Sequence, residues 1–203
     1  MTTPDRFRHV LGHFCTGVTV ITAADSAGPA GFTCQSFTAL SLDPPLVLFC
    51  PGKSSSTWRR IEGAGRFCAN VLADGQQEIA RQFASRAVDK FDGVAWSPLP
   101  SRPDSAFAPS SPDSPSSPRA SLPPGPPLLD GALAWVDAEV ETVHDGGDHW
   151  VVIGRVLDLG SSTALGQQPL LFYRGRFTIT EPESGTPELI DTLLAWPRHA
   201  DWI

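Results

Sequence analysis

The sequence of 203 residues predicts a mainly β protein, a closed or half-closed barrel with a few peripheral helices. Short runs rich in β-branched and apolar residues recur along the chain, and turns containing glycine or proline separate them. Few segments carry apolar residues at helical spacing, and no internal repeat is visible. Many strands of similar length with few helices are typical of a barrel.

The first quarter of the chain predicts one helix followed by strands. Residues 6–14 place their Phe, Val and Leu side chains on one helical face. Residues 17–22 are β-branched almost throughout and predict a strand. Residues 31–45 form a strand-like run rich in hydroxyl side chains that ends at a Pro-Pro corner. The continuous apolar run at residues 46–50 predicts a further strand.

The next segment alternates helices and strands. A short helix is expected at residues 56–61, with Ser or Thr as its cap. Residues 66–72 follow a glycine-bounded turn and predict a strand. Residues 76–84 place Ile79, Ala80 and Phe83 on one side of a helix.

The second half predicts a hairpin and two final strands. Apolar and polar residues alternate over residues 134–141, and an Asp-Gly-Gly-Asp turn leads into the strand-like residues 149–159. Residues 170–173 and 176–180 predict the last strands. Residues 187–203 are expected to form a helical tail that packs on its own barrel or across a dimer.

Residues 97–127 differ in composition from the rest of the chain. They hold 11 of the 20 prolines and nine serines. A segment of this composition has too little apolar surface to offset the entropy lost when it is ordered. We interpret them as a flexible insertion in a surface loop, because neither flank looks like a complete domain. A single domain over residues 1–203 is therefore expected.

Charge and cysteine spacing exclude several classes of protein. The net charge of −7 argues against a broad nucleic-acid-binding surface, which needs a basic face. No apolar run reaches the roughly 20 residues of a membrane span. The N-terminus has no secretory signal, so a cytoplasmic protein is expected. The four cysteines form no CxxC pair, which predicts buried free thiols and no metal site.

Several polar segments could carry chemistry, and each also has a structural interpretation. The hydroxyl-rich residues 31–45 fit either an edge strand or the wall of a polar ring site. The Gly-led cluster at residues 51–61 precedes a helix and suits an anion, although it is not a Walker A motif. Arg86 and Lys90 could reach a phosphate or be ordinary surface cations. His149 beside its turn and the aromatic residues 169–177 are ambiguous taken singly.

Taken in order, these motifs resemble the flavin reductase-like family. The series is Gly-x-Thr-x-x-Ser-Phe, Ser-Leu-Asp-Pro-Pro-Leu-Val, Ser-x-Thr, Phe-Cys-Ala-Asn-Val-Leu, Asp-Lys-Phe, Gly-Ala-Leu-Ala, Gly-Asp-His and Pro-Leu-Leu-Phe-Tyr-Arg-Gly. The resemblance extends from about Phe7 to Phe177 and is interrupted by the insertion. It is nearest to reductases that serve aromatic or steroid-ring hydroxylases.

The resemblance implies a split β-barrel that forms a homodimer and binds FMN or FAD near the subunit interface. It implies NADH or NADPH as hydride donor and a reduced-flavin-dependent monooxygenase as partner. By position it implies flavin contacts from Thr33, Cys34, Gln35, Ser36, Ser41, Leu42, Cys50, Pro51, Gly52, Lys53, Ser56, Thr57, Phe83, Ala84, Ser85 and Lys90. His149, as the catalytic residue that orients the nicotinamide, would be joined on that side by Tyr173 and Arg174.

Two departures and one electrostatic requirement accompany the resemblance. Gln35 stands where many relatives have Asn, and the insertion could cover or extend the dinucleotide site. Because the ligands and the protein are both anionic, we expect a local cluster of Lys53, Arg86, Lys90 and Arg174 to offset the net charge.

Two other classes of function remain open at this point. The fold could serve as a flavin- or haem-binding module without turnover, since fold does not determine function. Alternatively, the Pro/Ser segment could make the chain mainly an interaction scaffold.

Overall fold

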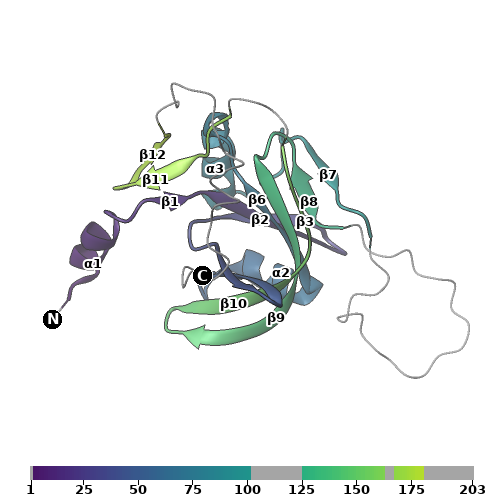
Figure 1. The fold of residues 1–203 in the computed structure, drawn as a ribbon, viewed down its shortest axis with the longest axis horizontal. Coiled ribbons are helices and arrows are strands. Elements are labelled where there is room, and N and C mark those ends of the chain that lie inside the picture. The colour runs from purple at the N-terminus through teal and green to yellow at the C-terminus, as the bar shows by residue number, and fades with distance from the viewer. Residues whose placement is uncertain (1, 102–124, 163–166, 181–203) are drawn as a thin grey trace, which may run out of the picture.

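The computed structural model describes residues 2–101, 125–162 and 167–180. Its centre is a seven-stranded antiparallel sheet in the order β3-β2-β6-β9-β10-β5-β4 (Figure 1). The helices are α1 (Pro4–Leu11), α2 (Ser56–Ala64) and α3 (Gln77–Ala84), the last preceded by the 3-10 turn η1 (Asp74–Gln76). The strands of the large sheet are β2 (Thr19–Asp25), β3 (Gly28–Cys34), β4 (Thr38–Leu42), β5 (Pro45–Phe49), β6 (Arg66–Val71), β9 (Ala134–Gly146) and β10 (His149–Ser161).

The sheet curls, so that strands far apart in its order approach each other. The Ser36 hydroxyl, just after β3, accepts a hydrogen bond of 2.8 Å from the Cys50 backbone N–H, just after β5. In the sheet order β3 and β5 are separated by β2, β6, β9 and β10. This incomplete closure confirms the predicted mainly β, split-barrel fold class.

Two apolar cores lie on opposite faces of the sheet. One packs Ile21, Phe49 and Phe67 against Trp58 and Ile61 of α2. The other packs Val18, Val20 and Leu72 against Ala80 and Phe83 of α3. Strand β2 contributes to both cores, which explains why its buried residues Thr19 to Ala23 follow one another without alternating with exposed polar residues.

Local sequence sets the limits of α2 and α3. The Ser55 hydroxyl caps α2 by accepting from the Trp58 N–H at 3.1 Å, and Gly65 ends it in the left-handed region with φ of 71°. The helix thus extends beyond the expected residues 56–61. Helix α3 matches the expected residues 76–84 to within one residue.

Helix α1 stands away from the large sheet, together with a small sheet of β1 (Thr16–Gly17), β11 (Leu171–Tyr173) and β12 (Arg176–Thr178) (Figure 1). The helix is shorter than the expected residues 6–14. It begins after the Thr3 cap with Pro4 in its first turn, and its C-cap is Gly12. None of its residues is buried.

The hydroxyl-rich residues 31–45 do not form one strand. They contribute to β3 and β4, which lie at opposite ends of the sheet order. Residues 35–37 connect the two strands across the gap, so the predicted run is divided by the curl of the sheet. The long hairpin of β9 and β10 forms as expected, with matched pairs from His149–Gly146 to Ser161–Ala134.

The ends of the Pro/Ser-rich segment are ordered. Strand β7 (Trp96–Pro98) pairs with β8 (Pro127–Leu129), so Ser97 and Pro127 belong to paired strands and not to a flexible insertion. The buried Asn70 holds β8 in place, because its side-chain oxygen accepts from the Leu129 N–H at 2.8 Å. Residues 102–124 and the predicted tail helix lie outside the described residues.

The cysteines are free thiols, as expected. Cys34 and Cys68 are buried, but Cys50 is half-buried and Cys15 is exposed beside α1, so the expected burial is wrong for Cys15. Among the described residues, no group of His, Cys, Asp and Glu is arranged to hold a metal ion. No helix in this part of the chain is long and apolar enough to cross a membrane.

Candidate functional site

Two neighbouring pockets follow strand β3. The inner pocket has a volume of about 490 Å³ and is lined by Phe32, Thr33, Cys34, Gln35, Ser36, Cys50, Pro51, Gly52, Ala84 and His149. The basic pocket has a volume of about 290 Å³ and is lined by Pro29, Ala30, Gly31, Ser56, Thr57, Arg60, Arg86, Ala87, Val88, Asp89, Lys90 and Phe91. Consecutive residues of β3 thus form a wall shared by both pockets.

Hydrogen bonds join two walls of the inner pocket. The Ser36 hydroxyl lies 3.3 Å from the Cys34 sulfur and holds the Cys50 N–H at 2.8 Å. The Thr33 hydroxyl donates to the Ala80 carbonyl at 2.6 Å, which fixes β3 against α3. Burial raises the pKa of the Cys34 thiol, so this side chain is neutral at physiological pH. The pocket walls therefore present backbone, hydroxyl and uncharged thiol groups.

His149 enters the inner pocket from the turn between β9 and β10. Gly147 has φ of 83°, which suits the first position of a two-residue type II′ turn formed by Gly147 and Asp148. The Asp148 carboxylate lies 2.7 Å from His149 Nδ1, and this hydrogen bond lowers the pKa of Asp148. Since Nδ1 is engaged, Nε2 is the nitrogen free to meet a ligand.

The loop before α2 is bound to the same turn. Gly52 forms a bridge with His149, the Lys53 N–H donates to the Asp148 carbonyl at 2.9 Å, and the Trp150 N–H donates to the Pro51 carbonyl at 2.9 Å. Main-chain pairing thus places His149 opposite Gly52 at the pocket wall.

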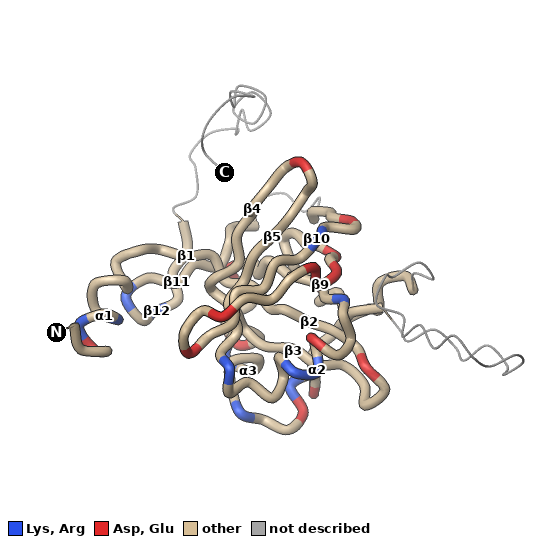
Figure 2. The backbone as a smooth tube through the Cα atoms, turned by 90° about the horizontal axis from the view of Figure 1, so that it is seen from below, with Lys and Arg blue, Asp and Glu red and all other residues tan. Residues whose placement is uncertain are grey.

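The basic pocket combines a helix N-terminus with cationic side chains. Ser56 and Thr57 occupy the first turn of α2, where backbone N–H groups lack intrahelical partners. The Lys90 ammonium donates to the Phe83 carbonyl at 2.9 Å, and partial burial lowers its pKa. Lys and Arg gather beside α2 and α3 (Figure 2). This arrangement suits an anionic group such as a phosphate.

One cation of this pocket is already paired. Arg60 donates to the Asp25 carboxylate at 2.8 and 2.7 Å and to the Gly28 carbonyl at 2.9 Å. It therefore fixes the start of β3 and contributes little free charge. Arg86 and Lys90 are the cations that remain for an anion at this pocket.

A glycine separates the two pockets. A Cβ atom at Gly31 would lie 2.7 Å from a ring carbon of the buried Phe83 and 3.1 Å from the Ile21 carbonyl. Only glycine fits this close approach of β3 to α3.

A third pocket, largely apolar, adjoins the inner pocket. Its volume is about 590 Å³, and it lies between α1 and the β11–β12 hairpin, lined by Phe7, Arg8, Leu11, Gly12, Phe14, Thr16, Gln35, Ser36, Phe172 and Gly175. Gln35 and Ser36 also line the inner pocket. The three pockets therefore form a series along one side of the barrel.

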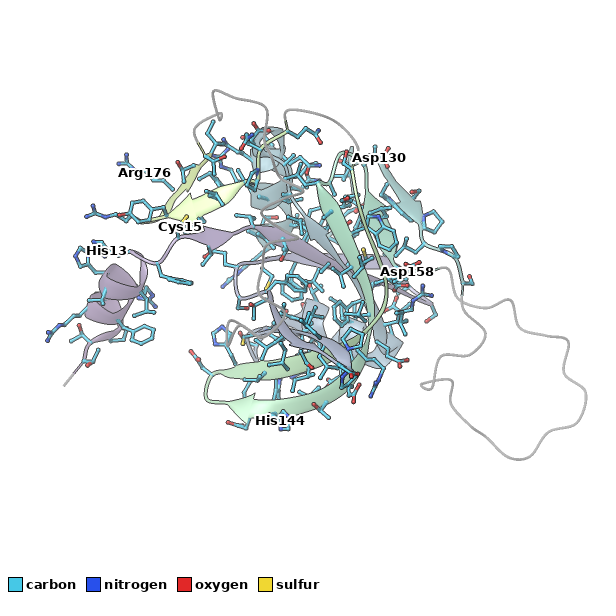
Figure 3. All side chains as sticks on the ribbon, in the orientation of Figure 1. His13, Cys15, Asp130, His144, Asp158 and Arg176 are labelled. Atoms are coloured by element: carbon cyan, nitrogen blue, oxygen red, sulfur yellow. The ribbon has the colours of Figure 1, made fainter. Side chains whose placement is uncertain are left out.

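The structure brings most of the predicted site residues together. Thr33, Cys34, Gln35, Ser36, Cys50, Pro51, Gly52, Ala84 and His149 line the inner pocket, and Ser56, Thr57 and Lys90 line the basic pocket. Tyr173 and Arg174 lie at the β11–β12 turn beside α1, where the Arg174 N–H donates to the Gly12 carbonyl at 2.9 Å. Figure 3 shows His13 and Cys15 on the same projecting arm.

Other predicted residues lie apart from these pockets. Ser41 and Leu42 belong to β4 at the sheet edge, and Leu42 is 76 % exposed. The Phe83 side chain is fully buried and shapes the site only through the core. Ser85 caps the end of α3, where its hydroxyl donates to the Gln82 carbonyl at 2.7 Å. None of these side chains lines the inner or the basic pocket.

The expected single cation cluster does not form. Arg86 and Lys90 share the basic pocket, but Arg174 lies beside α1 and Lys53 pairs with Asp145 of the β9–β10 hairpin. Sequence spacing could not reveal this division, because it depends on which strands the curled sheet brings together.

Sequence reasoning missed some lining residues. Pro29, Ala30 and Phe32 carry no reactive group, and their position in the strand that leads to Thr33 was the only available signal. Arg60 could have been found as a cation one helical turn after Ser56.

These residues fit a flavin nucleotide. The uncharged hydrogen-bonding walls of the inner pocket suit a flat polar ring, and the basic pocket beside it suits a phosphate. Gly31 allows β3, which lines both pockets, to lie directly against Phe83 of α3.

Comparisons with known proteins agree with this fit. Residues 11–181 match the family model described as flavin reductase like domain. The chain is 50 % identical over 184 residues to the "flavin-dependent monooxygenase, reductase subunit HsaB" of Rhodococcus jostii (strain RHA1), covering 91 % of this chain and 82 % of that protein.

Two solved structures share the fold. The "nitrilotriacetate monooxygenase component B" homologue from Mycobacterium thermoresistibile has a TM-score of 0.74 and 49 % identity, covering 90 % of this chain and 89 % of that chain. The "NADH:FAD oxidoreductase SgcE6" of Streptomyces globisporus, solved with NAD and FAD fragments, has a TM-score of 0.73 and 34 % identity, covering 91 % of this chain and 99 % of that chain. The chain therefore belongs to the flavin reductase-like family.

Proposed function

We propose the following roles for the residues of this chain, a flavin reductase that takes hydride from NADH or NADPH. The flavin ring occupies the inner pocket, and the phosphate end of FMN or FAD occupies the basic pocket. The observation that carries this assignment is the shared wall of β3, which runs from the basic pocket at Pro29 to the inner pocket at Ser36. A ring and its phosphate need such a continuous pair of sites.

The protein supplies binding and orientation for this reaction. A flavin held in these pockets would supply the hydride-accepting chemistry, and NADH or NADPH would supply the hydride. No side-chain nucleophile or general acid is required for hydride transfer. What the chain must provide is a site that would hold the two rings against each other in a near-attack arrangement.

His149 orients the nicotinamide. Asp148 engages Nδ1, so Nε2 points to the ligand side of the pocket as a hydrogen-bonding group. Tyr173 and Arg174 lie at the β11–β12 turn next to Gly175 of the third pocket, which shares Gln35 and Ser36 with the inner pocket. These three residues bind the nicotinamide nucleotide, while the β3 wall binds the flavin.

The test separates the two ligands. We expect His149→Ala to raise KM for NADH about tenfold and to leave the flavin Kd within twofold. The tenfold change corresponds to the loss of one hydrogen bond to a ligand, about 1.4 kcal/mol. Flavin fluorescence quenching gives the Kd, and NADH oxidation at saturating flavin gives KM. If flavin binding weakens equally, His149 holds the pocket together and does not bind the nicotinamide.

Lys90 and Arg86 recognise the phosphate. We expect Lys90→Met to raise the Kd of FMN about tenfold relative to wild type, since a hydrogen bond to a charged group contributes about 1.5–3 kcal/mol. Riboflavin, which lacks the phosphate, serves as the matched ligand and should bind both proteins equally. Equal weakening of riboflavin would place the phosphate elsewhere.

The reduced flavin passes to a partner monooxygenase. The relatives named as reductase subunits of flavin-dependent monooxygenases support this assignment. A non-catalytic flavin- or haem-binding module is the alternative, and steady NADH oxidation with added flavin distinguishes them, because a binder shows none. Deleting residues 102–124 should leave this rate unchanged if the chain is not chiefly an interaction scaffold.

The chain forms a homodimer through α1. Phe7, Val10, Leu11 and Phe14 are each more than half exposed on this projecting arm, although apolar surface of this kind is stabilised by burial. A second copy supplies the missing cover. Sedimentation analysis should give twice the chain mass, and Phe14→Glu should shift it toward the monomer.

A further inference from the structure

The resemblance implied that Lys53 contacts the flavin, but the structure places its side chain elsewhere. Its ammonium forms an ion pair with Asp145 near the end of β9. The same ammonium lies 4.6 Å from the centre of the Trp150 ring on β10. A cation over an aromatic face and beside a carboxylate is held by two attractions at once. Lys53 lines neither the inner nor the basic pocket.

These contacts surround His149. Trp150 is its chain neighbour, and Asp145 lies across the turn, where its second oxygen accepts from the Gly147 N–H at 3.0 Å. The main chain of Lys53 donates to the carbonyl of Asp148, the residue that engages His149 Nδ1. Lys53 is therefore bonded to both sides of the turn that carries His149.

We infer that Lys53, Asp145 and Trp150 form a clamp that positions His149 for the nicotinamide. The inference rests on the proposed role of His149 and reassigns Lys53 from flavin ligand to positioning residue. The loop before α2 carries Cys50 to Gly52, which line the inner pocket, and the hairpin turn carries His149. The clamp joins these two walls, so it sets the distance between the flavin side and the nicotinamide side.

The charge of Asp145 makes the inference testable, because two explanations predict opposite results. If Lys53 and Asp145 acted only through their charges on anionic ligands, neutralising Asp145 would favour ligand binding. If they act as a clamp, the same change releases the turn that carries His149 and raises KM for NADH. Lys53→Met tests a third explanation, in which the Lys53 side chain contacts the flavin directly. In that case the variant would weaken flavin binding and raise the flavin Kd.

The experiment uses the full chain, with KM for NADH, kcat and flavin Kd measured for Asp145→Asn, Lys53→Met and the double variant. We expect each single variant to raise KM for NADH about three- to fivefold, the effect of an exposed ion pair of up to about 1 kcal/mol. The flavin Kd stays within twofold. The double variant is no worse than the more affected single variant, because both remove one interaction. Lys53→Arg, which keeps the charge, restores KM.

A matched control removes the same charge from the same hairpin. Asp158→Asn lies on β10 nine residues beyond His149, about 30 Å along an extended strand, and should leave all three constants unchanged. Figure 3 shows Asp158 away from the His144 end of the hairpin.

Four kinetic or binding results would overturn the clamp: a lower KM for NADH in Asp145→Asn, weaker flavin binding in Lys53→Met, additive effects in the double variant, or an equal effect in Asp158→Asn. A second readout keeps the clamp distinct from the role of His149. The ¹H–¹⁵N signals of the His149 imidazole should shift in both clamp variants even if His149→Ala leaves KM unchanged. In that case the proposed role of His149 fails, whereas unshifted imidazole signals refute the clamp itself.

Discussion

The ion pair between Arg66 and Asp137 is the most buried among the described residues, and its removal should cost the most stability. Arg66 Nε and Nη2 donate to the two carboxylate oxygens of Asp137 at 2.8 and 2.6 Å. Their side chains are only 11 % and 3 % exposed. A third Arg66 nitrogen donates to the Pro100 carbonyl at 3.0 Å. The pair therefore joins β6, β9 and the start of the Pro/Ser-rich segment.

Removing one partner leaves an uncompensated buried charge. We expect Arg66→Met to lower the free energy of unfolding by about 3 kcal/mol, since breaking a buried pair costs about 3–5 kcal/mol. With a urea m-value of about 2 kcal/mol/M, the midpoint should fall by about 1.5 M. The assay is urea unfolding of the flavin-free protein at one fixed chain concentration, so that neither ligand binding nor a difference in protein concentration contributes to the comparison.

Two further variants test the reasoning. Arg155→Met breaks a pair with Glu141 whose side chains are 42 % and 29 % exposed, and it should cost at most about 1 kcal/mol. Combining Arg66→Met with Asp137→Leu removes both charges and should recover more than half of the loss. Equal losses for Arg66→Met and Arg155→Met would show that burial does not set the cost. No recovery in the double variant would refute the role of the stranded carboxylate.

Three further predictions concern packing, pH and thiol reactivity. Gly31→Ala should lower the free energy of unfolding by about 1–3 kcal/mol and weaken flavin binding, because the new Cβ would lie 2.7 Å from a buried ring carbon. Its control is Gly63→Ala in an open part of α2, which should raise the free energy of unfolding by up to about 1 kcal/mol in the same urea titration. The hydrogen bond from the lysine ammonium lowers the pKa of Asp145 from 3.8, so its contribution is complete above pH 3.8 and is lost as the pH falls through the lowered value. Acid unfolding of Asp145→Asn should accordingly depend less on pH below 3.8, and an unchanged curve would refute this. Maleimide should label the exposed Cys15 more than about tenfold faster than the buried Cys34, whose thiol has a raised pKa. Mass spectrometry of the labelled peptides measures both rates, and faster labelling of Cys34 would contradict the prediction.

The sequence alone determined most of the strands and the order of the motifs. The mostly β-branched residues 17–22 predicted a strand because their side chains are restricted at χ1, and the structure has β2 over Thr19–Asp25. The Ser/Thr cap predicted where α2 begins, whereas its end at Ala64 lies beyond the predicted residue 61. The hydroxyl-rich run after Gly31 and the Gly-Asp-His turn were visible as candidate sites because their polar residues follow known local rules. Such features depend on neighbours in the chain.

Tertiary structure decided which of these residues meet. Residues 31–45 were divided between opposite ends of the sheet, and the curl then brought Ser36 onto Cys50. Lys53 turned from the expected phosphate to Asp145, a partner 92 residues away. The physical reason is that strand pairing and curvature are set by the packing of two cores across the whole sheet. Contacts between distant segments follow from that packing and leave no periodicity or spacing in the sequence.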